Sequence, residues 1–347
     1  MQDKLTGLAV LEMKKKRKVS MQDIADQLGV SKGTISLVLS GKAESGRISE
    51  EMCRKVRATA EEMNYQPNEI ARSLSTGKTM TIGVIVSDIS NEFFGSMTFH
   101  IQEQAKKYGY TVVTTNTNEN LDEFNKMVTI LLNKQVDGII FVPVDNGQHI
   151  AARITKRHIP LVQIDRFYSD LEASYIVVDN YKISAKTTEH LILKGLKRIA
   201  VICYDFDVSA LIERRQGCID TLSKYNLLDP GLIKNIRYQY QEEDLKQAIH
   251  DLKNNSDKID AIFFCSRKVF ITGVKYMYKN AISIPEDMEV VCFDKIDSFA
   301  IANIPIIYIE QPIRKMGEKA VDILMEQMNG SNDRKQFVFD TELKYIN

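Results

Sequence analysis

The sequence has few cysteines, and their spacing suggests neither a disulfide framework nor a metal site. No Cys-x-x-Cys pair and no Cys/His spacing of a zinc ligand set occurs. The 5 cysteines are scattered, mostly in apolar runs: Cys53, Cys203, Cys218, Cys265 and Cys292. We therefore expect reduced, buried thiols, no metal and no cofactor.

Long hydrophobic runs are absent as well. No apolar stretch approaches the ~18 residues of a membrane helix, and the chain does not open with a secretory signal. The sequence therefore predicts a cytoplasmic protein that does not bind membranes.

The sequence also lacks common catalytic motifs. We find no Gly-x-Ser-x-Gly elbow, no Walker loop, no His-Glu-x-x-His and no Gly-x-Gly-x-x-Gly that follows a strand. The 5 histidines are spread along the chain without partners. We expect no catalytic residues, and an enzyme on an α/β scaffold stays an alternative.

Charge is unevenly distributed along the 347 residues, although the formal net charge is zero. Residues 13–78 carry 13 Lys and Arg against 8 Asp and Glu, which gives +5, and residues 79–347 carry −4. A basic head on a mildly acidic body suits a protein that meets phosphates at one end only. The length predicts two or three domains.

Residues 21–39, MQDIADQLGVSKGTISLVL, predict two short helices joined by a tight turn. Apolar residues recur at helical spacing on both sides of Gly29, and Ser31 can cap the second helix. Ser20 begins a capping box with Asp23. This pattern is typical of a helix-turn-helix, whose second helix enters the major groove of DNA. The candidates for DNA contact are Ser20 and, on the outward side of the second helix, Ser31, Lys32, Gly33, Thr34, Ser36 and Leu37. An ordinary helical hairpin is the alternative.

A basic run, KKKRKV, precedes this motif. It resembles a nuclear-localisation signal, but five cations directly before a DNA-binding motif favour an arm that lies along DNA phosphates. We assign residues 1–18 to this flexible basic arm and residues 19–66 to the helix-turn-helix domain.

A hinge follows the third helix that we expect from Ser49 to about Met63. Pro67 ends that helix, and Asn68 can cap a short new one within the hinge and linker at residues 67–78. Such a short helix is marginal in water, so we expect it to form with DNA or a partner subunit.

After the hinge, short apolar strands alternate with amphipathic helices, which predicts parallel sheets covered on both faces. The strands are expected at 81–86, 110–116, 137–142, 161–165, 175–179, 198–202, 261–265 and 289–294. Helices are expected at 92–108, 120–134, 181–195, 241–254 and 312–328. Their number suggests two α/β lobes with a cleft, and ligands in such folds lie beyond the carboxyl ends of strands. The polar residues at those positions are Ser87, Asp88, Asp165, Arg166, Asp179 and Asp294.

With its motifs in this order, the chain resembles the LacI/GalR family of bacterial transcription regulators from Ser20 to the C-terminus. The most specific segments are DIADQLGVSKGTIS, NYQPNEIARSLSTGKTMTIGVIV, IDR, VDN and CFD. The resemblance implies a multidomain protein: an all-α headpiece and a two-lobed core like the type I periplasmic binding proteins. The core at 79–347 is expected to bind effector and to dimerise. Its N-lobe would be about 79–178 plus 311–330, and its C-lobe about 179–310 plus 331–347.

The family resemblance also implies how DNA is bound. A homodimer would read a pseudo-palindromic operator with two recognition helices. Leu74 of each subunit would wedge into the minor groove, with Asn68 and Ala71 on the same helical face.

For the effector, the resemblance implies ligand positions at Phe93, Phe94, Arg214, Asp294 and Gln311, beside the strand-end residues above. An aromatic platform with aspartates and an arginine suits a carbohydrate or a derivative. Each position has a plainer alternative. The two phenylalanines could belong to the core, the aspartates could cap helices, and Arg214 could form a surface ion pair.

The chain departs from the family pattern at three places. Leu37 replaces an arginine that usually reads guanine, and the loop from Gly41 to Ile48 is about three residues longer. Arg267 and Lys268 replace an Asn-Asp pair near the cleft. The two cations predict an anionic or phosphorylated sugar, and the alternative is that both point to solvent.

Together these patterns predict an effector-controlled transcription regulator, a repressor rather than an activator. A sugar-binding receptor without gene control remains the second alternative, beside an enzyme.

Overall fold

The computed structural model describes residues 19–67, 69–254, 257–296 and 305–346. The chain divides into two compact units, residues 1–77 and residues 78–347. The basic arm expected at residues 1–18 lies outside the described residues.

The first unit is helical, as the sequence predicts. Ser20 caps α1: its Oγ accepts from the backbone N of Asp23, whose carboxylate in turn accepts from the Ser20 N–H. Gly29 ends α1 at φ 65°, a conformation that glycine adopts without strain. Ser31 caps α2 through the backbone N of Thr34, at 3.1 Å. The helices are α1 Met21–Leu28, α2 Lys32–Leu39, η1 Glu44–Gly46, α3 Glu50–Glu62 and α4 Glu69–Thr76.

A small apolar core joins the first three helices. Its fully buried members are Ile24, Ala25, Ile35, Val38 and Val56. These are the residues that the helical spacing turns inward. The polar side of α2 is therefore left at the surface.

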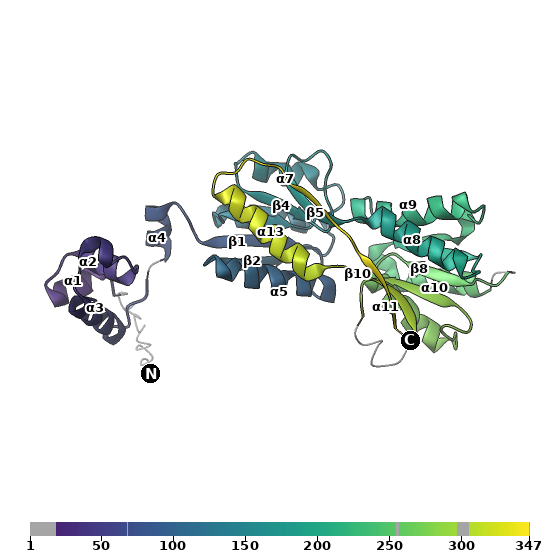
Figure 1. Ribbon diagram of the computed structural model, residues 1–347, viewed down its shortest axis with the longest axis horizontal. Coiled ribbons are helices and arrows are strands. Elements are labelled where there is room, and N and C mark those ends of the chain that lie inside the picture. The colour runs from purple at the N-terminus through teal and green to yellow at the C-terminus, as the bar shows by residue number, and fades with distance from the viewer. Residues whose placement is uncertain (1–18, 68, 255–256, 297–304, 347) are drawn as a thin grey trace, which may run out of the picture. The chain divides into compact units, whose positions relative to one another are not determined.

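The second unit contains two lobes, each built on a six-stranded sheet with helices on both faces (Figure 1). The first sheet is entirely parallel, in the order β11-β5-β4-β3-β1-β2. Helices α5 and α13 pack side by side on one face of it, and α6 and α7 cover the other. Its strands are β1 Thr81–Val86, β2 Thr111–Asn116, β3 Gly138–Phe141, β4 Leu161–Ile164, β5 Ser174–Val178 and β11 Gln336–Phe339. Its helices are α5 Glu92–Lys107, α6 Leu121–Asn133, α7 Gln148–Thr155 and α13 Ile313–Met328.

The second sheet repeats the plan in the order β12-β10-β9-β8-β6-β7, with β12 antiparallel to β10. Helices α8 and α9 pack together, as do α10 and α11. Its strands are β6 Ile199–Tyr204, β7 Ile233–Ile236, β8 Ala261–Phe264, β9 Glu289–Phe293, β10 Ile306–Glu310 and β12 Glu342–Ile346. Its helices are α8 Asn180–Leu193, α9 Ser209–Lys224, α10 Gln241–Lys253 and α11 Arg267–Lys279. Two short 3-10 helices, η2 Pro230–Leu232 and η3 Tyr238–Tyr240, flank β7.

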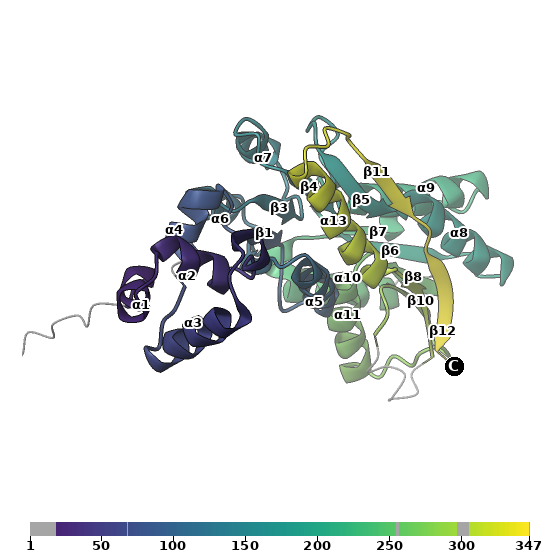
Figure 2. The ribbon, with the colours of Figure 1, turned by 60° about the vertical axis from the view of Figure 1, so that its left-hand side comes forward.

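The chain passes between the lobes three times: after β5, after β10 and between β11 and β12. Figure 2 shows the last passage as a continuous segment that runs from the edge of one sheet to the edge of the other. The prediction that residues 331–347 all belong to the C-lobe is therefore wrong for β11. That strand pairs with β5 of the first lobe, with Phe337 opposite Ile176, because an unpaired edge beside β5 gains a full ladder of backbone hydrogen bonds.

Candidate functional site

The exposed side of α2 carries most of the predicted DNA contacts. Ser31, Lys32, Gly33 and Ser36 are exposed, and Thr34 and Leu37 are half-buried. Ser20 is half-buried and serves as the cap of α1. Leu37 packs against the long loop, because a Cβ placed on Gly46 would lie 2.7 Å from its Cδ1. Their contact with DNA stays a prediction.

The hinge residues are described only in part. Helix α4 spans Glu69–Thr76, and Leu74 on it is 81% exposed. A single exposed leucine is common at protein surfaces, so this exposure leaves Leu74 accessible to a partner without identifying one. Asn68 and the side chain of Ala71, both predicted to lie beside Leu74, are outside the described residues.

A narrow cleft of about 50 Å³, partly open to solvent, lies where strands of both lobes end. Nine residues that the sequence predicts for the effector line it: Asp88, Phe93, Phe94, Asp165, Arg166, Arg214, Arg267, Asp294 and Gln311. The topology explains this convergence, because parallel strands of a sheet end at the same edge. That these residues bind an effector stays a prediction.

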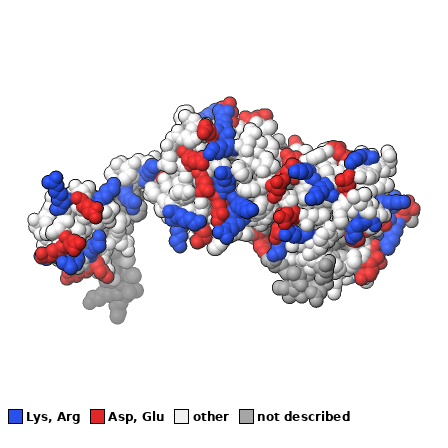
Figure 3. Space-filling model, in the orientation of Figure 1, with Lys and Arg blue, Asp and Glu red and all other residues white. Residues whose placement is uncertain are grey.

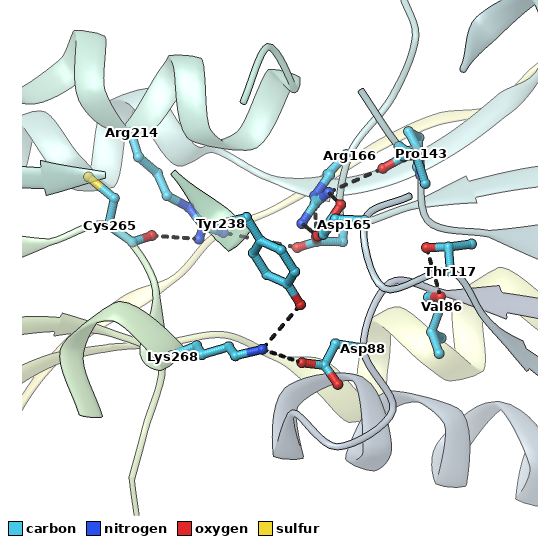
Figure 4. A network of polar contacts seen from close by, with 12 residues as sticks. Val86, Asp88, Thr117, Pro143, Asp165, Arg166, Arg214, Tyr238, Cys265 and Lys268 are labelled. Atoms are coloured by element: carbon cyan, nitrogen blue, oxygen red, sulfur yellow. Dashed lines mark hydrogen bonds and ion pairs between the residues drawn. The ribbon is translucent and has the colours of Figure 1, made fainter. Parts of the chain in front are cut away.

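Arg166 is held by a buried network on the first-lobe side (Figure 4). Its guanidinium donates to both carboxylate oxygens of Glu119, at 2.7 and 2.9 Å, and to the carbonyl of Pro143 at 3.2 Å. Its Nε lies 3.3 Å from Asp165. Because its donors are engaged by the protein, Arg166 shapes the wall of the cleft.

Arg214 occupies the other side and is buried, so the surface ion pair considered for it is wrong. Its Nε donates to Asn180 at 2.8 Å, and its Nη1 donates to the carbonyl of Cys265 at 3.0 Å. The guanidinium also lies 3.5 Å above the ring of Phe293. Its remaining nitrogen, Nη2, lies 4.0 Å from Asp165 across the cleft.

Asp165 and Asp294 follow strands of the two lobes in similar ways. Both have positive φ, 70° and 91°, a conformation that is uncommon for residues other than glycine and concentrates at functional sites. Burial raises the pKa of both carboxyls, and for Asp294 the pKa rises to about 6 although Arg214 and Gln311 oppose the shift. Gln311 donates a hydrogen bond to Asp294. In contrast, Asp179 caps α8, which confirms the helix-cap alternative there.

Phe93 and Phe94 fit both interpretations of the sequence. They are 4% and 5% exposed and belong to the core of the first lobe, and both also line the cleft. Their rings meet edge to face with centroids 5.0 Å apart. An apolar wall of this kind is available for a sugar ring face.

Some cleft residues have polar atoms that the protein leaves unsatisfied. Ser87 Oγ, Ser266 Oγ and Gln311 Oε1 are buried and have no hydrogen-bond partner among the described residues. An unpaired buried polar atom costs free energy unless a ligand or water pairs with it. A ligand with several hydroxyl groups supplies both donors and acceptors to such atoms.

Arg267 and Lys268 do not point to solvent, contrary to the alternative considered for them. Lys268 Nζ lies 2.9 Å from Asp88 Oδ2 and 3.1 Å from the hydroxyl of Tyr238 (Figure 4). Arg267 pairs with Glu92 and donates to the carbonyl of Lys295. Both cations come from the second lobe, and both of their acidic partners come from the first.

Several residues of the cleft wall were not predicted from the sequence. Ser266 directly follows the strand expected at 261–265, and Tyr204 lies two residues beyond the one expected at 198–202, so the strand-end rule that indicated Asp88 could have found both. Asn91, Glu119 and Tyr238 lie away from the expected strand ends and carried no signal in the sequence. Among the described residues, no cluster of His, Cys, Asp and Glu suited to a metal ion is found. Within the same set, no helix is long and apolar enough to cross a membrane.

In comparison with known proteins, each of the two units matches a family model. Residues 20–68 match the model for bacterial regulatory proteins of the lacI family, and residues 79–340 match that for periplasmic binding proteins and the sugar binding domain of the LacI family. The chain therefore belongs to the LacI family: it is a DNA-binding transcription regulator with an effector-binding core, and not an enzyme.

Individual relatives match over nearly the whole chain. A ribose operon repressor from Haemophilus influenzae is 27% identical, over 90% of this chain and 93% of its own. The transcriptional repressor PurR from Aliivibrio salmonicida is 26% identical, over 91% of this chain and 94% of its own length. The fold is similar to that of the lac repressor dimer bound to operator and the anti-inducer ONPF, with a TM-score of 0.82 and 20% sequence identity. The match covers 95% of this chain and 99% of the lac repressor chain.

Proposed function

We propose that the chain is a cytoplasmic transcription repressor that binds a pseudo-palindromic operator as a homodimer. A carbohydrate or a carbohydrate derivative in the cleft controls its affinity for the operator. Two relatives named as repressors, one of a ribose operon, support this proposal. A receptor without gene control is set aside, because the headpiece matches the family's regulatory domain.

The headpiece supports the DNA-binding half of the proposal. Helix α2 has its apolar side in the core and its short polar residues, with Lys32, at the surface. Small side chains let a helix approach base edges closely in the major groove. On the face drawn in Figure 3, Lys and Arg are interspersed with Asp and Glu on the headpiece as well as on the core, so the surplus of cations that phosphate contacts need comes from the basic run at residues 14–18.

The observation that carries the effector half is the set of unpaired buried atoms in the cleft. Ser87, Ser266 and Gln311 each present one, beside the buried carboxylate of Asp294 and the apolar wall of Phe93. Sugar-binding clefts combine an apolar wall with a few placed polar groups in this way.

The charge of the cleft favours an uncharged sugar over the anionic one that Arg267 and Lys268 predict from the sequence. The lining carries four basic and four acidic side chains, and each of these two cations already contacts a carboxylate. A phosphate would have to displace an acidic partner before it gained either cation.

DNA binding is tested by a gel shift with genomic fragments, comparing Lys32→Ala with Lys55→Ala. Lys55 is an exposed headpiece lysine paired with Glu51 on α3, which makes it a matched control. If Lys32 reads a base, its loss costs about 1–3 kcal/mol and relaxes sequence preference. A footprint without two-fold symmetry, or equal losses in both variants, contradicts the proposal.

Effector binding is tested by a thermal-shift screen over sugars and matched sugar phosphates, followed by calorimetric titration. A specific ligand raises the melting temperature by mass action. Asp294→Asn should lose this shift, and Asp340→Asn, whose side chain is 91% exposed, should keep it. A shift that survives Asp294→Asn would place the ligand elsewhere.

A further inference from the structure

Two neighbouring residues of the second lobe tie it to the first across the mouth of the cleft. Arg267 is the first residue of α11 and pairs with Glu92, the first residue of α5. Lys268 is the second residue of α11 and pairs with Asp88, which follows β1. Each ion pair therefore joins the two lobes directly.

Lys268 occupies a built site on this surface. Its ammonium contacts the Asp88 carboxylate and the Tyr238 hydroxyl, and it lies 4.7 Å from the centroid of the Tyr238 ring. A carboxylate beside an aromatic face is a common way to hold a cation. Tyr238 also packs on Tyr204, with centroids 5.4 Å apart, so the ring that supports Lys268 is itself fixed.

Asp88 has only one oxygen available to the cleft. Its Oδ1 accepts from the backbone N and the hydroxyl of Ser90, at 3.0 and 2.5 Å. Its Oδ2 accepts from Lys268. A carboxylate oxygen accepts two hydrogen bonds, so Lys268 holds one of the two acceptor positions of Oδ2, and a ligand hydroxyl that donates to this oxygen must fit beside the ammonium or displace it.

We infer that Lys268 is an internal competitor of the effector, a cation that holds Asp88 and keeps the ligand-free cleft closed until a ligand displaces it. This inference rests on the proposed function, because it concerns the same cleft. The Arg267–Glu92 pair, placed one residue earlier on the same helix, supports the closed arrangement.

The inference predicts opposite effects on binding for the two partners of the ion pair. Lys268→Met removes the competitor and should tighten binding about two- to fivefold, the range that a partly exposed ion pair allows. Asp88→Asn removes a charged acceptor of the ligand and should weaken binding. Salt screens exposed charges, so added NaCl should tighten sugar binding to the unaltered chain and leave Lys268→Met unchanged.

The experiment uses the full-length chain with two readouts. D-ribose and cellobiose are the probes, titrated calorimetrically at low and high NaCl. The distance between the lobes is measured without a probe by double electron–electron resonance, with spin labels at Lys126→Cys on α6 and Leu193→Cys on α8. Cys53→Ser removes the half-buried native cysteine, which could otherwise take up the label. Lys275→Met, an exposed lysine on the same helix as Lys268, is the matched control.

We expect Lys268→Met to lengthen the distance between the lobes and to tighten probe binding, with Lys275→Met unchanged in both. An unchanged distance, or weaker binding by Lys268→Met, overturns the inference, since weaker binding would make Lys268 a ligand contact. If the distance increases and no probe binds any variant, the closed arrangement is supported and the proposed sugar effector fails instead.

Discussion

The headpiece and the core expose their functional side chains in opposite ways. In the headpiece, Lys32 and Leu74 stand in solvent on short helices, and their neighbours along the chain place them there. In the core, Arg166, Arg214 and Asp294 are each no more than 7% exposed, and residues from distant segments surround them. A surface that meets DNA needs little prior desolvation, whereas a cleft for a small ligand must bury polar groups and satisfy them.

The largest expected effect comes from separating the two regions. A chain that lacks residues 1–78 should lose all measurable operator affinity, because the cations and the recognition helix lie in that segment. It should keep its response to sugars in a thermal-shift assay. Operator binding that survives the deletion would show that the core itself contacts DNA.

The next effect concerns the buried network of the core. Arg166→Met leaves the carboxylate of Glu119 without its cation and leaves Asp165 with only Arg214, 4.0 Å away. Removing one partner of a buried pair costs about 3–5 kcal/mol, measured as the loss in free energy of unfolding in urea. Arg153→Met, at a partly exposed arginine of α7, is the control and should cost far less. Equal losses would mean that the network adds nothing beyond packing.

The pH dependence of stability tests the buried carboxyl of Asp294. Its pKa in the folded chain, about 6, lies above the ordinary 3.8, so the folded state binds this proton more tightly than the unfolded state. The resulting stabilisation is complete below about pH 4 and is lost as the pH rises through 6. Relative to Asp294→Asn, the unaltered chain should lose up to about 3 kcal/mol over that range in urea unfolding. Parallel pH curves for the two proteins would contradict the assignment.

The smallest effect on folding is expected at Leu74. Because its side chain is 81% exposed, Leu74→Ala should leave the free energy of unfolding within about 0.5 kcal/mol. If Leu74 wedges between base steps, the substitution should weaken operator binding much more than binding to random DNA. Filter-binding titrations on both DNAs measure this, and equal losses would show that Leu74 only packs the hinge.

The sequence by itself determines most of the headpiece and the strand–helix order of the core. Ser20, Gly29 and Ser31 are caps and turns whose effect is local, so their roles follow from neighbouring residues. The strands up to β9, except the partly exposed β7, are recognisable for the same reason, since buried parallel strands form continuous hydrophobic runs. The strand ends then indicate the cleft aspartates.

Tertiary structure alone decided the place of β11 and the charge pairs across the cleft. Strand β11 is short and its burial alternates with exposure, so only its pairing with β5 assigns it to the first lobe. Lys268 and Asp88 lie 180 positions apart, and nothing near either residue indicates that they meet. Charge pairs between lobes depend on how two sheets face each other, a long-range geometry that local propensity and periodicity do not encode. This is why the sequence placed two cations near the cleft, while the fold determined that acidic side chains of the opposite lobe hold them.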